Sequence, residues 1–381
     1  MFRILFFCIT LSWLWPGASL AQQPPEGTWH FAVSGDSRNC GDVIMPAIAK
    51  SVREHQARFY WHLGDFRLGS GVDDDMQEQF GSGLTLEEYR KKAWDDFIAQ
   101  QITPFDPVTV YLGIGNHELY MHGTTKEDRT QSHADFLRTF STWLGGSKTA
   151  YYNWKMENVH FINLDNSMDS GFEATQLAWL EGVLKGDASD SDVRAVVVGM
   201  HRALPNSLAC AHSMNGDPHS SAESNRKSLE SGRKAYEYLW KFQNATGKHV
   251  YVLASHSHFY MASIFNTPYW NHKNEKDKGI LNGRKEETTL DGWIIGTAGA
   301  VRYRLPENLP AKTPAITYAY GYLLGSVSRD GKIEFEFQQV TEDSIPREIK
   351  EKYGKPFVDF CFLANRHDAL HVPEESCSEQ F

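Results

Sequence analysis

Short apolar runs alternate with amphipathic stretches along most of the chain. The runs at 29–33 and 59–63 have the length of buried strands. Between them, apolar residues recur at helical spacing over 42–55. A strand, a helix and a strand at this spacing predict a right-handed crossover unit, in which the two strands run parallel in one sheet.

The alternation of helices and strands continues down the chain. Further helices are expected at 86–101, 134–144, 174–184 and 227–242. Further strands are expected at 108–112, 150–156, 159–164, 193–198, 249–253, 292–297, 317–326 and 332–340. Residues 69–83 are rich in Gly and Asp and predict a loop, and the pattern weakens into a tail from Pro346 onward. This order of elements predicts the α/β fold class.

The N-terminus has the pattern of a secretory signal peptide. Arg3 precedes an apolar run over 4–15, and small residues end the segment at Ala21, so we assign residues 1–21 to the signal. The run is short for a membrane span, and no later stretch could be one. We expect an exported protein, periplasmic or secreted, without a transmembrane span, with one main domain at 28–342 and a C-terminal extension at 343–381.

The charge balance narrows the class of partner. The chain carries a formal net charge of −10, and cleavage after Ala21 would remove one further positive charge, that of Arg3. Binding to nucleic acid or to an anionic membrane surface needs a basic surface, so we expect neither. Small phosphorylated substrates remain possible because bound metal ions supply local positive charge. The oligomeric state stays open.

Four cysteines remain after the predicted cleavage. An even number in an oxidising compartment predicts two disulfides, for which three pairings exist. We favour Cys40–Cys210, because both follow presumed site-forming strands, and Cys361–Cys377, which would hold the C-terminal tail. A zinc site made of these cysteines is not expected, because no C-x-x-C spacing occurs.

Polar side chains follow the ends of five predicted strands. The residues at these positions are Asp36, Asp65, Asn116 with His117, His201, and His256 with His258. Each alone is more often a helix cap, a turn residue or a buried histidine than a ligand. Together, at the strand ends where open α/β sheets bind ligands, they predict a metal site. Carboxylate and amide oxygens mixed with imidazoles suit two divalent ions such as Mn, Fe or Zn.

The order of these fragments resembles the calcineurin-like metallophosphoesterase superfamily. The fragments are Gly35-Asp36, Gly64-Asp65, Gly115-Asn116-His117-Glu118, His201, and His256-x-His258, and they span most of the mature chain. The resemblance implies a two-sheet αββα sandwich and a catalytic domain at 28–342. It also implies a metal-dependent phosphoesterase, in which a metal-bound hydroxide attacks phosphorus.

The resemblance further implies a role for each residue. Asp36 and His258 would bind the first ion, and Asp65 would bridge the two ions. The ligands of the second ion would be Asn116, His201 and His256. His117 would be the general acid for the leaving group, and Glu118 would support the site from outside the ligand set.

One position departs from the family pattern. The first motif is usually D-x-H, and this chain has Arg38 where the histidine is expected. Nor does a tyrosine follow Asp65 by three residues, as in purple acid phosphatases, because Leu68 stands there. Asn39 or a water could complete the first site. Arg38 would then be free to bind a substrate phosphate, with Arg67 and Arg202 as rival phosphate-binding residues.

Two further expectations concern the loop at 204–221 and the rival function. We expect His212 and His219, which lie in this loop, to be solvated. The rival to an enzyme is a non-catalytic descendant of the same fold that binds metal or phosphate. The presence of Asp65, His117 and His258 argues against it, because an inactive site need not keep them. Monoester, diester, nucleotide and phospholipid substrates all remain open.

Overall fold

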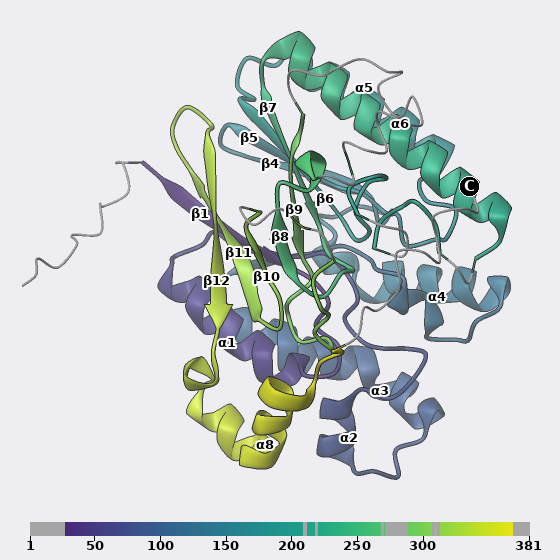
Figure 1. The fold of residues 1–381 in the computed structure, drawn as a ribbon, viewed down its shortest axis with the longest axis vertical. Coiled ribbons are helices and arrows are strands. Elements are labelled where there is room, and N and C mark those ends of the chain that lie inside the picture. Colours follow the sequence, from purple (N-terminus) through teal and green to yellow (C-terminus); the bar gives the residue numbers. More distant parts are fainter. Residues whose placement is uncertain are drawn as a thin grey trace, which may run out of the picture.

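Two β sheets lie face to face between helices (Figure 1). The computed structural model describes residues 27–208, 212–217, 220–267, 270, 289–306, 309 and 313–368. The predicted signal peptide at 1–21 lies outside the described residues. Within the described part of the chain, no helix is long and apolar enough to cross a membrane.

The first sheet has five strands in the order β12-β11-β1-β2-β3. Their bounds are β1 (Trp29–Ser34), β2 (Phe59–His62), β3 (Thr109–Leu112), β11 (Tyr320–Val327) and β12 (Ile333–Val340). The strands β1, β2 and β3 are parallel, as the crossover pattern predicts. The hairpin of β11 and β12 joins β1 in antiparallel pairing.

The second sheet has seven strands in the order β10-β8-β9-β7-β6-β5-β4. Their bounds are β4 (Tyr152–Met156), β5 (Val159–Asn163), β6 (Ala195–Met200), β7 (His249–Ala254), β8 (Tyr260–Ala262), β9 (Asp291–Ile295) and β10 (Ala315–Ile316). The central strands β5, β6, β7 and β9 are parallel. Their continuous apolar sequences fit burial on both faces.

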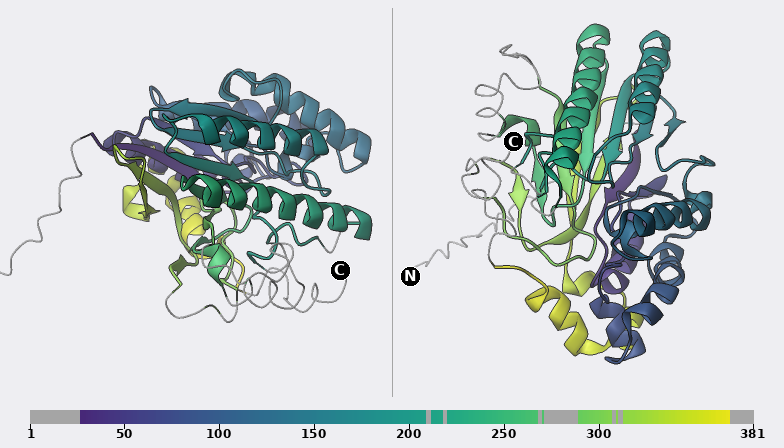
Figure 2. Two further views of the ribbon diagram at one scale, coloured as in Figure 1. Left: turned by 90° about the horizontal axis from the view of Figure 1, so that it is seen from above. Right: turned by 90° about the vertical axis from the view of Figure 1, so that its right-hand side faces the viewer.

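Helices cover the outer face of each sheet, which gives four layers. Against the first sheet pack α1 (Gly41–Glu54), α3 (Leu86–Phe97), α4 (Lys126–Thr139) and α8 (Arg347–Asp359). Against the second pack α5 (Ala174–Ser189) and α6 (Ala222–Thr246), side by side (Figure 2). The predicted αββα sandwich is therefore confirmed.

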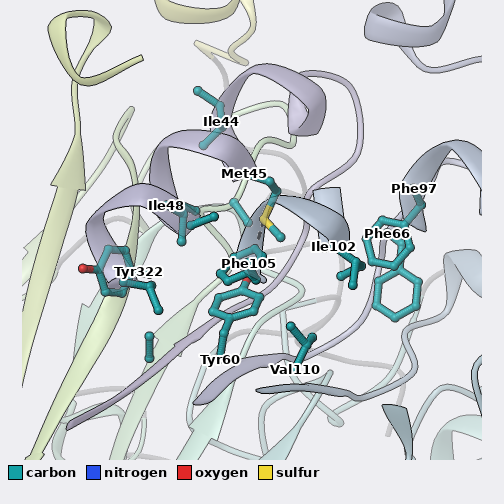
Figure 3. Packing of buried hydrophobic residues seen from close by; sticks show 14 of the residues in the cluster. Ile44, Met45, Ile48, Tyr60, Phe66, Phe97, Ile102, Phe105, Val110 and Tyr322 are labelled. Atoms are coloured by element: carbon teal, nitrogen blue, oxygen red, sulfur yellow. Dashed lines mark hydrogen bonds between the residues drawn. The ribbon is translucent and has the colours of Figure 1, made fainter. Parts of the chain in front are cut away.

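Three apolar clusters hold the layers together. Between the sheets, aromatic and aliphatic side chains such as Phe31, Trp61 and Phe161 interdigitate. Ile44 and Ile48 of α1 pack against the outer face of the first sheet (Figure 3). A third cluster fills the space between the second sheet and its two helices. Burial of apolar surface is the main favourable term in folding. The clusters therefore fix the position of each sheet against the other, and with it the place where the strand ends meet.

Several predicted elements differ from the observed ones. The loop predicted at 69–83 contains α2 (Asp74–Phe80), whose N-terminal turn carries Asp74 and Asp75. Helix α4 begins eight residues before the predicted start at Ala134, because Thr125 caps it. The predicted tail contains α8, where Gly354 and Pro356 interrupt the helical pattern. Helix α8 packs into the cluster under α1, so this part of the extension shares the main core.

The predicted disulfide pairing is wrong. Cys40, just before α1, bonds to Cys361, just after α8, with their Cα atoms 5.9 Å apart. Neither Cys40–Cys210 nor Cys361–Cys377 can therefore form, and Cys210 and Cys377 lie outside the described residues. The cause is tertiary, because the docking of α8 beside α1 brings together two cysteines 321 positions apart.

Candidate metal centre

The predicted site residues gather at one end of the two sheets. Asp36, Asp65 and Asn116 follow β1, β2 and β3 of the first sheet. His201 and His256 follow β6 and β7 of the second sheet. Since all five strands point the same way, their carboxyl ends bring these side chains to a common edge.

Three of these residues have a strained backbone. Asp36, Asp65 and His256 have φ values of 60°, 61° and 67°, in the left-handed region that non-glycine residues seldom adopt. Such conformations persist where the surroundings enforce them, and they are frequent at functional sites. Here they occur at three of the donor residues that follow the strand ends.

Four donor atoms converge in one group, which we call the second group. His201 Nε2 lies 3.1 Å from Asn116 Oδ1, 3.1 Å from His256 Nδ1 and 3.3 Å from Asp65 Oδ1. The ligand atoms of Asp65, His201 and His256 all lie within 4.8 Å of one another. Two nitrogens and two oxygens in this arrangement suit a divalent ion of the Mn, Fe or Zn class.

A hydrogen bond to the backbone holds His201 of this group in place. His201 Nδ1 lies 3.0 Å from the Leu63 carbonyl, to which it donates, so Nε2 is left to face the donors. Burial opposes the charged form of His201, but Asp65 raises the pKa of His201 to about 9. Burial, and then the charge of His201, lower the pKa of His256 well below its usual value. Two close imidazoles beside a carboxylate fit a shared cation.

The donors expected for the first ion are also together, but with an arginine among them. His258 Nε2 lies 3.2 Å from Asp36 Oδ1, and we call these two side chains with Asp65 Oδ2 the first group. Arg38 Nη2 donates to His258 Nε2 at 2.9 Å, and Arg38 Nε lies 3.8 Å from Asp65 Oδ2. The guanidinium thus lies among the atoms that would bind the first ion.

Three buried atoms of this region lack hydrogen-bond partners among the described residues. They are Asp36 Oδ1, Asp65 Oδ2 and Arg38 Nε. Buried carboxylate oxygens without a partner are costly unless a cation balances them. The donor types fit a metal ion, but the guanidinium already lies among them, so the first group does not fit an ion while Arg38 stays there.

His117 also contacts Arg38. Its Nδ1 donates to the Leu68 carbonyl at 2.6 Å, and its Nε2 accepts from Arg38 Nη1 at 2.5 Å. Burial, and then the charge of Arg38, lower the pKa of His117 to about 4. The imidazole is therefore neutral in this arrangement, with Nε2 facing the centre. Its role as general acid stays a prediction.

Glu118 joins two of the ligand-bearing loops. Its carboxylate accepts hydrogen bonds from the backbone amides of Asp65 at 2.8 Å, Phe66 at 2.7 Å and Gly115 at 2.7 Å. Burial, and then the charge of Asp65, raise the pKa of Glu118 to about 7. Gly115 itself packs so closely that a Cβ there would overlap Asp65 Oδ1. Glu118 and Gly115 thus fix the position of Asp65.

Two predicted site residues lie elsewhere. Arg67 is fully buried, and its guanidinium donates to Asp42, Asp75 and Asp96, which does not support its predicted role as a phosphate-binding residue. Asp42 and Asp96 lie on α1 and α3, and Asp75 lies on α2, the helix that the sequence did not predict. Asn39 donates its amide nitrogen to Asp74 at 2.9 Å on the same helix, which does not support its role as a ligand.

Arg202 lies beside the second group but is tied to the protein. Its Nε donates to the Asn166 carbonyl at 3.0 Å, and its Nη2 donates to the carbonyls of Asn166 and Met168. These bonds orient the guanidinium at the end of β6. Contact of Arg202 with a substrate phosphate stays a prediction.

Two aromatic residues at the site were not found from the sequence. Tyr303 stacks on His258 with ring centroids 4.0 Å apart. His212, expected to be solvated, is buried, and its Nδ1 lies 2.9 Å from Ser257 Oγ, between the two histidines of the H-x-H motif. His219 lies outside the described residues. Neither residue sits at a strand end, so strand-end reasoning could not find them.

Comparison with known proteins supports the fold. No protein-family model matches the chain, and no curated protein matches it in sequence. Purple acid phosphatase PPD1 from yellow lupin (Lupinus luteus) seeds is similar in structure, with a TM-score of 0.52 and 16% identity over 82% of this chain and 51% of that chain. PhoD is similar with a TM-score of 0.51 and 13% identity, over 82% of this chain and 72% of that chain.

A third similar structure is GAP50, the anchor in the inner membrane complex of Plasmodium. Its TM-score of 0.47, with 10% identity over 82% of this chain and 84% of that chain, is too low to argue from. The chain spans about half the length of the lupin phosphatase, at 51%. At these identities the likeness shows the fold alone, which this chain shares with the lupin purple acid phosphatase and with PhoD.

Proposed function

We propose that this protein is a metal-dependent phosphoesterase. The observation that carries the proposal is the second group, where Asp65, Asn116, His201 and His256 present four donor atoms to one point. The fold shared with phosphatases supports it. No serine or cysteine nucleophile is needed for such a reaction.

When bound by the second group, a divalent ion supplies a Lewis acid and lowers the pKa of a water for attack on phosphorus. The residues of the chain prepare the rest. Glu118 and Gly115 hold Asp65, and the Leu63 carbonyl fixes the ring of His201. His117 Nε2 faces the centre but accepts a hydrogen bond from Arg38 there, so as general acid it would first take up a proton at Nε2 in place of that hydrogen bond and then give it to the leaving oxygen. Arg38 and Arg202 supply positive charge for phosphate oxygens.

The test is hydrolysis by metal-free protein reconstituted separately with Mn, Fe or Zn. The probes are p-nitrophenyl phosphate, a monoester, and bis-p-nitrophenyl phosphate, a diester. We expect metal-dependent release of p-nitrophenol and its loss in His201→Ala. A matched control is His249→Ala, because His249 is an exposed histidine at the start of β7, away from the donors.

The rival function gives a different result in the same experiment. A non-catalytic descendant would bind the ion through the second group and release no product from either ester. The insertion of Arg38 into the first group is the observation that favours this rival. Hydrolysis that His249→Ala retains and His201→Ala loses would exclude it.

Export is part of the proposal. The signal-peptide pattern at 1–21 supports it, and the disulfide between Cys40 and Cys361 is consistent with an oxidising compartment. The protein recovered outside the cytoplasm should have the mass of a chain that begins at Gln22. A mass that includes residues 1–21 would contradict cleavage.

A further inference from the structure

We infer that the guanidinium of Arg38 takes the place of the first metal ion, so that the centre holds one ion, in the second group. This inference rests on the proposed function and deepens it, because it replaces the two-ion arrangement that the sequence resemblance implies. It concerns the side chains of the first group, Asp36, Asp65 and His258, with His117 at its edge.

Arg38 contacts two of the three side chains of the first group, His258 and Asp65, and also contacts His117. His258 Nδ1 donates to the Val301 carbonyl at 2.6 Å, so its Nε2 presents a lone pair, which accepts from Arg38 Nη2 at 2.9 Å. His117 Nε2 accepts from Arg38 Nη1 at 2.5 Å. A guanidinium cannot ligate a metal, because it has donors only. Its hydrogen bond to His258 Nε2 instead occupies the lone pair through which His258 would bind an ion.

The backbone around Arg38 is pinned on both sides. The amides of Asp36 and Ser37 donate to the carbonyls of Gly64 and Asp65 at 2.9 and 3.0 Å. The amide of Asn39 donates to Asp73 Oδ1 at 2.8 Å, and Cys40 is held by its disulfide. Residue 38 can therefore leave the first group only by side-chain rotation.

The surroundings of the side chain also oppose its exit. Arg38 is 8% exposed, and the ring of Tyr303 stacks on His258 beside it. Arg38 Nε has no hydrogen-bond partner among the described residues, but it lies 3.8 Å from the Asp65 carboxylate. The guanidinium is thus held by its attraction to the Asp65 carboxylate and by hydrogen bonds to the rings of His117 and His258.

The charges of the centre agree with one ion. Asp36 and Asp65 contribute two negative charges, and Arg38 contributes one positive charge. The two groups together with Arg38 therefore have a net charge of minus one, from two carboxylates and one guanidinium. One divalent ion makes the centre singly positive. A second ion beside the guanidinium would add two further positive charges to a buried place, where like charges repel strongly.

The experiment compares metal content in wild type, Arg38→His and Arg38→Met, each stripped of metal and reloaded with excess Mn²⁺. Elemental analysis gives ions per chain, and electron paramagnetic resonance separates isolated ions from spin-coupled pairs. The matched control is Arg129→Met, because Arg129 pairs with Asp169 and lies over the ring of Tyr120, and it is neither a hydrogen-bond nor an ion-pair partner of the donors.

We expect one ion per chain and the spectrum of isolated ions in wild type and in Arg129→Met. In Arg38→His, which restores the D-x-H motif, we expect ion content to double and a coupled signal to appear. Arg38→Met removes the charge without adding a ligand, so its affinity for a second ion should exceed that of wild type. These readouts do not depend on activity.

The other outcomes test the inference and the proposed function separately. Two ions and a coupled signal in wild type would show that Arg38 leaves the first group, while the proposed function would stand if the protein hydrolyses the ester probes. No ion in wild type would overturn both the inference and the proposed function. One ion in wild type without any hydrolysis would support the inference and overturn the proposed function. If Arg38→His fails to fold, the wild-type measurement still decides.

Discussion

The disulfide between Cys40 and Cys361 should contribute substantially to stability. It closes a loop of 321 positions, and the chain-entropy relation gives about 6 kcal/mol at 25 °C for a loop of this size. Measured values usually fall below the relation, so we predict a loss of about 3–5 kcal/mol when both cysteines become alanine. Alanine is the suitable replacement, because both cysteines are fully buried. The expected fall in Tm is about 4–8 °C.

The assay is equilibrium unfolding in urea of wild type, Cys40→Ala, Cys361→Ala and the double variant, without reductant. Because one bond joins the two cysteines, each single variant should lose nearly as much free energy as the double variant. If each cysteine belonged to a different bridge, the single losses would add in the double variant. Additive losses, or a loss below about 1 kcal/mol, would refute the pairing and the reasoning.

Three further predictions concern the site and its support. Arg67→Met should cost about 3–5 kcal/mol at pH 7, since it leaves buried carboxylates without a countercharge. Burial raises the pKa of Asp96 to about 6 in wild type even though Arg67 lowers it, so without Arg67 this pKa lies higher, and the deficit of the variant in urea should shrink as the pH falls toward 6; a deficit independent of pH would contradict this. Gly115→Ala should weaken Mn²⁺ binding by roughly 10–100-fold, because its Cβ displaces Asp65, and unchanged affinity by calorimetry would contradict the packing. His117→Ala should lower kcat by roughly 10²–10⁴-fold for an alkyl phosphate and by less for p-nitrophenyl phosphate, whose leaving group needs no proton, whereas equal losses would exclude the general-acid role.

The layers of the fold follow from apolar patterns that the sequence shows directly. Strands such as β6 and β7 are continuous apolar runs, because parallel strands are covered on both faces. Helices with weak patterns were harder. Helix α4 buries few apolar residues and begins at a capping box, and α8 is interrupted at Gly354. For such helices, packing against the rest of the chain decides what local periodicity cannot.

The convergence of the proposed ligands could be predicted because each follows a strand end. The structure brings Asp65, Asn116, His201 and His256 together, as the strand directions required. The surroundings of the arginines could not be predicted. Arg67 meets Asp75 from α2, a helix with little apolar pattern, and the disulfide of Cys40 depends on where α8 docks. Both results come from contacts between segments whose spacing in sequence carries no signal.

The position of Arg38 lies between these cases. The sequence shows an arginine where the family pattern has a histidine, and it predicts a guanidinium free to bind a substrate phosphate; the structure shows a second arrangement, with the guanidinium inside the first group. The second arrangement depends on the rings of His117 and His258, whose Nδ1 atoms are tied to backbone carbonyls. Those tautomers are set by tertiary contacts.

The most direct test of the account is anomalous diffraction near the manganese absorption edge, from crystals of the Mn²⁺-loaded protein. We predict one peak within ligand distance of Asp65, Asn116, His201 and His256, with the guanidinium of Arg38 still between His117 and His258. An empty second group, with no peak near these four side chains, would contradict the metal site on which the proposed phosphoesterase function depends.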